Sequence, residues 1–367
     1  MSFYNFVCSL DYNALRDSIM NKNTNDVLRA ISKPFLNEDD FAALLSPAAE
    51  AVLENIAARA QNESHKHFGK SIVLYTPMYL SNYCVNSCLY CGFNHANNIE
   101  RRCLSFAEIE NEAEVISKAG LRHILLLTGE CREKSSVNYI SQAVKIVSKF
   151  FDSISLEIYP LTEKEYKQVV DAGVDGLTIY QEVYNFDSYK YVHVKGPKSN
   201  YRNRIDAPQR ACMAGIRSLS IGVLLGLDDW RVETFFCGLH LQYLIRKYPD
   251  VEYSVSIPRI RSHAGHFDRV VDTNNQNIVQ IITAYRNFLP FAGINLSTRE
   301  NEFLRDNLIP LGITRMSAGV STSVGGHSGD IKSEEQFEIS DKRSVESVKK
   351  AILSKGYQPI LKDWIRV

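Results

Sequence analysis

The sequence predicts an α/β protein whose centre is a closed (β/α)8 barrel of the TIM type. Two observations lead to this prediction. From residue 71 onward, eight short segments rich in Ile, Leu, Val and Tyr recur, and helical patterns separate them. The segments are continuous apolar runs, which are typical of parallel strands buried on both faces. Eight β/α units over roughly 250 residues match the usual size of such a barrel.

Three parts are expected along the chain, at residues 1–70, 71–320 and 321–367. The first is a helical extension, in which apolar residues at helical spacing predict a helix. These residues are Phe41, Leu44, Leu45, Ala48, Val52, Ile56 and Ala60.

The second part holds the barrel strands. They are predicted at Ile72–Pro77, His123–Thr128, Ile154–Tyr159, Gly176–Tyr180, Leu219–Gly226, Tyr253–Pro258, Gly293–Thr298 and Ile313–Ser317. Between them, Ser105 with Glu108 fits the capping box, in which a hydroxyl and a carboxylate satisfy free backbone N–H groups. Thr162 with Glu165 repeats this pattern at a later helix. An open doubly wound sheet is the alternative, but no Gly-x-Gly-x-x-Gly follows an early strand.

A polar loop rich in Gly and Ser at residues 319–329 leads from the barrel into the third part. A helix is expected near Ser344–Lys355, followed by a short tail. We expect this C-terminal extension to close the barrel.

The charge balance argues against some classes of function. The chain of 367 residues has 42 Lys and Arg and 42 Asp and Glu, so its formal net charge is zero. A general nucleic-acid binder needs a basic surface, so no nucleic-acid partner is expected. The apolar runs are too short for a membrane span, and the first residues lack a signal-peptide pattern. We therefore expect a cytoplasmic protein that does not associate with membranes.

Three of the eight cysteines, Cys84, Cys88 and Cys91, fall within eight residues directly after the first strand. In a reducing compartment such a cluster suggests metal ligation rather than disulfides. Structural zinc needs four ligands, and only His95 is available as a fourth. An inert cysteine-rich loop is a further alternative. A [4Fe–4S] cluster held by three thiolates, with one iron left open, fits this spacing best.

The Cys-x-x-x-Cys-x-x-Cys spacing, with Tyr90 directly before the last cysteine, resembles the radical S-adenosylmethionine (SAM) superfamily. The resemblance implies a radical SAM barrel in which the open iron binds SAM as a consumed cosubstrate. It also implies roles at the ends of the next strands. Thr128-Gly129-Glu130 resembles the family's Gly-Gly-Glu motif, in which the carboxylate binds the SAM ammonium. Glu157 resembles a ribose-binding position, although an ion pair with a nearby Lys or Arg is the alternative.

Later motifs are similar to the aromatic amino-acid lyases of this superfamily, and most of all to the tyrosine lyases of thiamine biosynthesis. The motifs lie at Tyr180–Tyr184, Gly196–Arg204, Ile257–Arg261, Leu296–Glu300, Met316–Gly319 and Gln336–Arg343. The resemblance implies cleavage of the Cα–Cβ bond of L-tyrosine to 2-iminoacetate (dehydroglycine) and p-cresol. SAM would become 5′-deoxyadenosine and methionine.

The resemblance also assigns residues to the substrate. Arg299 resembles the family's carboxylate-binding arginine, because a guanidinium suits a carboxylate. Ser317 is expected to bond the amino or carboxylate group, and Tyr79 to lie near SAM. Arg259 and Arg261 are expected to contact substrate or SAM. Each of these residues has an ordinary structural alternative, such as a salt bridge.

Partners are implied only by the resemblance. They are flavodoxin or ferredoxin as electron donor, and the thiazole synthase as a partner that receives the unstable product. A hydrogenase-maturation tyrosine lyase is one rival. Such enzymes carry further C-terminal cysteines for a second cluster, but no cysteine follows Cys237 here, so the rival would have to lack that cluster. A zinc-stabilised binding module is another. Cys131, which follows Glu130, is singled out as a possible further site residue.

Overall fold

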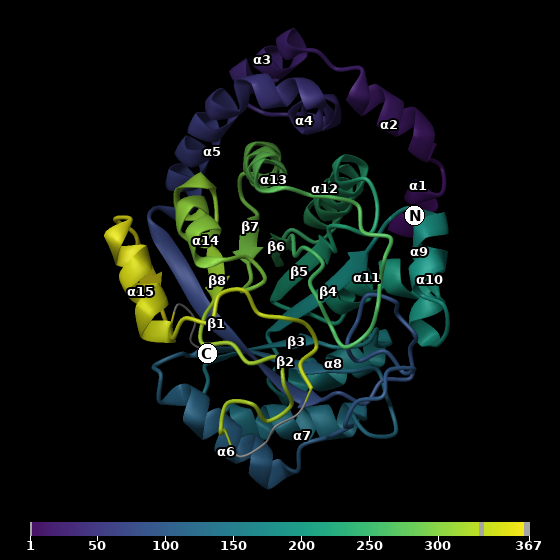
Figure 1. Ribbon diagram of the computed structural model, residues 1–367, viewed down its shortest axis with the longest axis vertical. Coiled ribbons are helices and arrows are strands. Elements are labelled where there is room, and N and C mark those ends of the chain that lie inside the picture. The colour runs from purple at the N-terminus through teal and green to yellow at the C-terminus, as the bar shows by residue number, and fades with distance from the viewer. Residues whose placement is uncertain (1, 330–333, 363–367) are drawn as a thin grey trace.

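The computed structural model describes residues 2–329 and 334–362, and these form a closed barrel of eight parallel strands with helices around it (Figure 1). The strands neighbour one another in the order β2 to β8 and then β1, and β1 also pairs with β2, which closes the barrel. They are β1 Ser71–Ser81, β2 His123–Thr128, β3 Ser153–Glu157, β4 Gly176–Glu182, β5 Ser218–Val223, β6 Glu252–Ser256, β7 Gly293–Leu296 and β8 Arg315–Ser317. The predicted barrel and its eight strands are confirmed.

Helices cover the outside of the barrel, as the predicted α/β alternation requires. They are α6 Phe106–Ser117, α7 Val137–Val147, α8 Glu163–Ala172, α9 Phe186–Val192, α10 Tyr201–Ile205, α11 Ala207–Met213, α12 Trp230–Lys247, α13 Asn275–Phe288, α14 Glu302–Leu308 and α15 Val345–Ser354. Short 3-10 turns lie at η2 Pro197–Ser199 and η3 Ile309–Leu311. Both predicted capping boxes are present, at the starts of α6 and α8.

The single helix predicted in the N-terminal part is interrupted. The chain forms α1 Phe3–Val7, α2 Tyr12–Met20, α3 Thr24–Ser32, α4 Glu38–Leu45, the 3-10 turn η1 Pro47–Val52 and α5 Leu53–Phe68. The break falls at Pro47, because proline lacks the N–H that a continuing helix needs. Buried Gln280 of α13 donates hydrogen bonds of 2.9 Å to the carbonyls of Leu44 and Ser46, so the break is satisfied inside the protein. These helices arch over α12 and α13 (Figure 1).

A short strand near the C-terminus was not predicted from the sequence. β9 Gln358–Ile360 pairs in parallel with the start of β1, where only a tail was expected. Its three residues, Gln-Pro-Ile, carry no apolar run that would indicate a strand.

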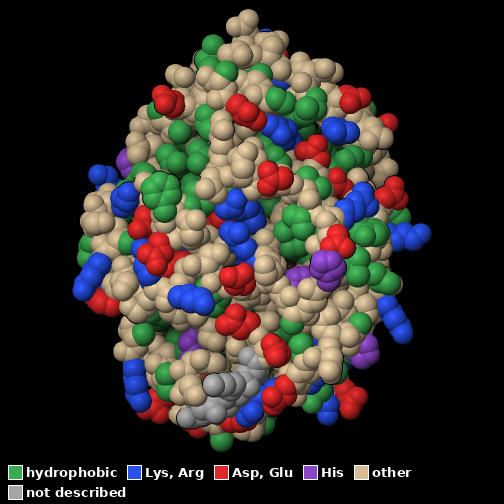
Figure 2. All heavy atoms as spheres, viewed as in Figure 1, with side chains coloured by type: hydrophobic (Ala, Val, Ile, Leu, Met, Phe, Trp, Pro, Cys, Tyr) green, Lys and Arg blue, Asp and Glu red, His purple; other side chains and the backbone are tan. Residues whose placement is uncertain are grey.

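Acidic and basic side chains are interspersed over the face shown in Figure 2, in keeping with the balanced composition. Among the described residues, no single helix has both the length and the apolar character needed to cross a membrane. Only the pair formed by α4 and Pro47–Phe68 meets that test, and it is bent by 78°.

Two described segments after β8, residues 318–329 and 334–343, lie at the barrel mouth, which is the end formed by the C-terminal ends of the strands. Val324 forms a parallel bridge with Tyr79 of β1. We call residues 334–343 the C-terminal strap. The strap bonds to the loops after β6 and β7, because Glu338 N donates to Ser262 O at 2.9 Å and Ser340 N donates to Thr298 O at 2.9 Å.

Candidate active site at the barrel mouth

A cavity opens at the barrel mouth, where polar residues from the ends of several strands converge. Its lining includes most of the residues that the sequence singled out. They are Tyr79, Cys84, Cys88, Tyr90, Cys91, Thr128, Gly129, Glu130, Glu157 and Arg299. Active sites of such barrels form at this end, which makes the cavity the candidate active site.

A second chamber adjoins the first, since Tyr79, Glu157 and Arg299 line both. Ser317, at the end of β8, lines this second chamber only. Its hydroxyl oxygen accepts a hydrogen bond of 3.2 Å from Thr298 N, which ties the ends of β7 and β8 together. The structure therefore brings Ser317 and Arg299 to one compartment, as the sequence predicted for two residues of one substrate site.

The three cysteines lie in a loop whose backbone carbonyls accept hydrogen bonds from side chains outside the cavity. Arg101 donates to the carbonyls of Asn82 and Phe93 at 2.8 and 2.9 Å, and its second terminal nitrogen reaches Asn94 O at 2.6 Å. Asn97 donates to Gly92 O at 3.0 Å. An irregular loop is thus fixed by side chains that satisfy its carbonyls, so the cysteine positions do not depend on regular secondary structure.

Burial raises the pKa of the Cys88 thiol to about 12, and it also raises the pKa of Cys91. Binding to iron promotes the thiolate form and releases the protons, so cluster assembly offsets this penalty. The sulfurs also have N–H donors. Asn86 Nδ2 lies 3.8 Å from Cys84 Sγ, and Gln336 Nε2 lies 3.7 Å from Cys91 Sγ. In the described part of the chain, no three His, Cys, Asp or Glu side chains are grouped to hold a single metal ion.

The end of β2 packs against the cysteine loop. A methyl group on Gly129 would collide with the carbonyl oxygen of Tyr83, so only glycine allows the two backbones to approach this closely. Glu130 accepts a hydrogen bond of 2.6 Å from Asn86 Nδ2, and its carbonyl accepts one of 2.9 Å from Val85 N. Thr128 Oγ1 is buried without a hydrogen-bond partner among the described residues, which indicates a site suited to a polar ligand.

Glu157 is a carboxyl group in an apolar setting. Burial and the neighbouring charge of Glu182 together raise its pKa to about 7, although the positive charge of Arg299 opposes the change. In the described chain, no Lys or Arg lies within ion-pair distance of Glu157, so the alternative of a local salt bridge has no partner there. A carboxyl group that lines a cavity without a protein partner is suited to accept hydrogen bonds from a bound molecule.

Sequence reasoning missed an ion-pair cluster on the cavity wall. Lys198 Nζ lies 2.7 Å from Glu182, and Arg204 lies 3.7 Å from the same carboxylate. Both cations line the cavity. Glu182 also has a backbone φ of 73°, the one positive value among the described non-glycine residues. Such a strained position at a strand end is a feature of functional sites that sequence alone does not reveal.

Arg299 lies at the border of the two chambers. Its Nη1 donates to Arg259 O at 3.2 Å, and its guanidinium carbon lies 3.4 Å from the centre of the Phe337 ring. Burial lowers the pKa of Arg299, although neighbouring Tyr79 opposes this shift. The stacked ring and the backbone carbonyl fix the guanidinium without neutralising it, which leaves a cation free to bind a carboxylate.

The side chains of Arg259 and Arg261 line neither chamber. Both pair with buried Glu300, Arg259 through two guanidinium nitrogens and Arg261 at 3.0 Å. Both arginines therefore form salt bridges, which is the structural alternative that the sequence analysis gave for them. Cys131 also lies outside the lining of both chambers.

Comparisons with known proteins identify families and relatives that this chain resembles. Residues 78–236 match the Radical SAM superfamily, and residues 256–358 match the Biotin and Thiamin Synthesis associated domain. The chain is 39% identical over 356 residues to 2-iminoacetate synthase of Escherichia coli strain K12, which spans 97% of this chain and 94% of that protein. It is 28% identical over 199 residues to 3-methylornithine synthase of Methanosarcina acetivorans, which spans 53% of this chain and 55% of that protein.

Solved structures agree with this relationship. HydG, a maturase of the [FeFe]-hydrogenase, superposes with a TM-score of 0.90 at 29% identity, over 95% of this chain and 80% of that chain. Methylornithine synthase (PylB) superposes with a TM-score of 0.71 at 20% identity, over 91% and 97% of the two chains, which shows a shared fold.

Proposed function

This chain belongs to the 2-iminoacetate synthase family of radical SAM lyases, and from that premise we propose that it cleaves the Cα–Cβ bond of L-tyrosine. The proposed products are 2-iminoacetate and p-cresol, and 2-iminoacetate would feed thiazole formation in thiamine biosynthesis. One observation carries the proposal. Arg299, a cation without a carboxylate ion-pair partner in the described chain, lines both the chamber that holds the cysteines and the chamber that holds Ser317.

The family's [4Fe–4S] cluster and SAM fit the donor set of the main chamber. Cys84, Cys88 and Cys91 would hold the cluster, whose iron would convert these thiols to thiolates. When bound, cluster and SAM supply one-electron chemistry that generates a hydrogen-abstracting radical, and the protein supplies orientation and exclusion of water. Glu130 would accept from the SAM ammonium and Glu157 from the ribose, while Thr128, Gly129 and Tyr90 line the same space.

The substrate would occupy the adjoining chamber. Arg299 would bind the tyrosine carboxylate, and Ser317 would bond its carboxylate or amino group. Tyr79 lines both chambers and would separate substrate from SAM. We assign Arg259 a supporting role, because its carbonyl holds Arg299 while its side chain is engaged by Glu300. Arg261 shares that carboxylate.

The finer biological setting is also part of the proposal. The product is an imine that hydrolyses in water, which favours direct transfer to a thiazole synthase in a complex. A flavodoxin or ferredoxin would supply the electron. Unpaired cysteines and an Fe–S cluster suit the reducing cytoplasm.

An anaerobic assay tests the reaction. Reconstituted enzyme, SAM, dithionite and L-tyrosine should yield p-cresol, 5′-deoxyadenosine and glyoxylate, the hydrolysis product of 2-iminoacetate. Cys88→Ala should yield none of the three. Formation of 5′-deoxyadenosine without p-cresol would refute the tyrosine assignment, and SAM cleavage by Cys88→Ala would refute the cluster assignment.

The likeness to HydG supports a second candidate, in which the same cleavage serves hydrogenase maturation. Complementation separates the two. Expression in a bacterium that lacks its own 2-iminoacetate synthase should restore growth without thiamine, whereas a maturation enzyme should leave the thiamine requirement in place.

A further inference from the structure

The side chain of Gln336 connects the C-terminal strap to the cysteine loop. Its Oε1 accepts a hydrogen bond of 2.7 Å from the Tyr79 hydroxyl, and its Nε2 lies 3.7 Å from Cys91 Sγ. A tyrosine hydroxyl can donate or accept, so the sulfur decides which way the amide faces. A thiolate only accepts hydrogen bonds, so the NH₂ group must face the sulfur and the amide oxygen must face Tyr79.

The strap backbone fixes this side chain in place. Gly92 N donates to Gln336 O at 3.1 Å, and Gln336 N donates to Thr322 O at 3.2 Å. A Cβ atom on Gly92 would lie 2.5 Å from Gln336 O and 3.0 Å from Glu335 O. The residue after Cys91 must therefore be glycine for the strap to lie directly on the cysteine loop.

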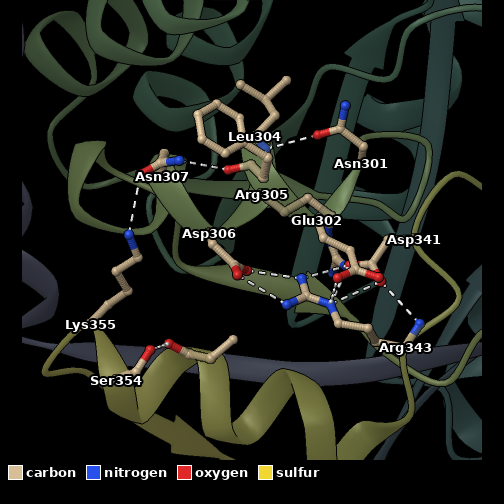
Figure 3. Close-up of polar contacts among 12 residues, drawn as sticks. Asn301, Glu302, Leu304, Arg305, Asp306, Asn307, Asp341, Arg343, Ser354 and Lys355 are labelled. Atoms are coloured by element: carbon tan, nitrogen blue, oxygen red, sulfur yellow. Dashed lines mark hydrogen bonds and ion pairs between the residues drawn. The ribbon is translucent and has the colours of Figure 1, made fainter.

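An ion-pair cluster holds the far end of the strap (Figure 3). Asp341 pairs with Arg305 of α14, both side chains are fully buried, and Arg305 also donates to the carbonyl of Ser317. Arg343 pairs with both Asp341 and Asp306, since its Nη2 lies 2.8 Å from Asp341 Oδ2 and 2.9 Å from Asp306 Oδ1. Because both ends of the strap are anchored, Gln336 is held against the cysteine loop by the fold.

We propose that Gln336 is a positioning residue that sets the reduction potential of the cluster through a hydrogen bond to Cys91 Sγ. The reduced cluster carries one more negative charge than the oxidised cluster, so an N–H group aimed at a ligand sulfur stabilises the reduced form and raises the potential. The C-terminal extension thereby contributes to the electronic properties of a cluster whose ligands all come from the cysteine loop after β1. This inference goes beyond the tyrosine reaction, because it concerns only the cluster.

The test is a redox titration of the reconstituted holoenzyme, without SAM or tyrosine, in which the reduced cluster is followed by its EPR signal. Gln336→Met keeps the length of the side chain and removes the N–H donor. We expect the one-electron reduction equilibrium to become about tenfold less favourable, which corresponds to a midpoint potential about 59 mV lower. Gln336→Glu keeps the acceptor for Tyr79 and adds a negative charge, so its midpoint should fall further.

Gln168→Met is the matched control, since Gln168 is exposed on α8 and bonds only Asn138 among the described residues. Its midpoint should equal that of the unmodified enzyme. An unchanged midpoint in both Gln336 variants at full iron content would overturn the proposal. A higher midpoint in Gln336→Met would also overturn it, because it would show that Gln336 acts by excluding water. Neither result bears on whether tyrosine is the substrate, which the product assay decides.

Discussion

Arg299 is the residue whose chemistry is most specific to an amino-acid substrate. A charge-assisted bidentate hydrogen bond to a carboxylate contributes about 1.5–3 kcal/mol, and a lysine cannot form that fork. We expect Arg299→Lys to raise the KM for tyrosine by about 10- to 100-fold. SAM cleavage in the absence of tyrosine should be affected much less.

Steady-state p-cresol formation at varied tyrosine concentration measures this effect. Arg217→Lys serves as the control, because Arg217 lies at the opposite end of the barrel, where it pairs with Glu252 at 2.8 Å. Equal KM values for Arg299→Lys and the unmodified enzyme would remove Arg299 from the substrate site.

Glu157 predicts a pH dependence of SAM binding. Burial raises its pKa to about 7, so the carboxyl group is mostly neutral at pH 6 and mostly ionised at pH 8. A carboxylate accepts hydrogen bonds from ribose hydroxyls better than a carboxylic acid does. SAM affinity should therefore fall as the pH is lowered from 8 to 6.

Equilibrium binding of SAM to the reconstituted enzyme across this range measures the effect. Glu157→Gln cannot ionise, so it should bind SAM more weakly at pH 8 and show no such slope. If the slope persists in Glu157→Gln, another group is responsible for it.

The contact between the end of β2 and the cysteine loop is an element-scale feature. Gly129→Ala should push the two backbones apart, because the added methyl group meets the Tyr83 carbonyl rather than a flexible side chain. We expect the variant to fold and to bind less than half the iron of the unmodified protein after reconstitution. Iron analysis and the visible spectrum of the cluster measure this loss.

Gly356→Ala separates this local effect from ordinary backbone strain. Gly356 has a φ of 76° and nothing within 4 Å of an added Cβ, so its substitution costs about 1–2 kcal/mol of stability without touching the site. Its iron content should be normal. Equal iron loss in both glycine variants would mean that general destabilisation, not the β2 contact, explains the result.

At the scale of the whole molecule, sequence reasoning succeeded where chemistry is local. Runs such as His123–Thr128 predict buried parallel strands, and Cys84, Cys88 and Cys91 with Glu130 share one loop and the next strand end. In the structure these four residues line one cavity. Sequence reasoning failed where a contact depends on segments that are distant in the chain. Nothing near Lys198 in sequence indicates that Glu182 draws it into the cavity, and nothing near Arg259 indicates that Glu300 engages it.

The buried pair of Arg305 and Asp341 provides the test of how the C-terminal extension and the barrel depend on each other. Both side chains are fully buried, so Asp341→Ala would leave a guanidinium without its partner in an apolar interior. Such a loss costs about 3–5 kcal/mol, whereas apolar replacement of both partners is often neutral. We expect Asp341→Ala to lower the denaturant midpoint strongly and Arg305→Met with Asp341→Leu to recover most of that loss. Urea unfolding followed by circular dichroism measures both. Because Gln336 is on the same strap, the double variant should also keep a near-normal reduction potential of the cluster. If the double variant is instead as unstable as Asp341→Ala, the charges themselves hold the extension to the barrel.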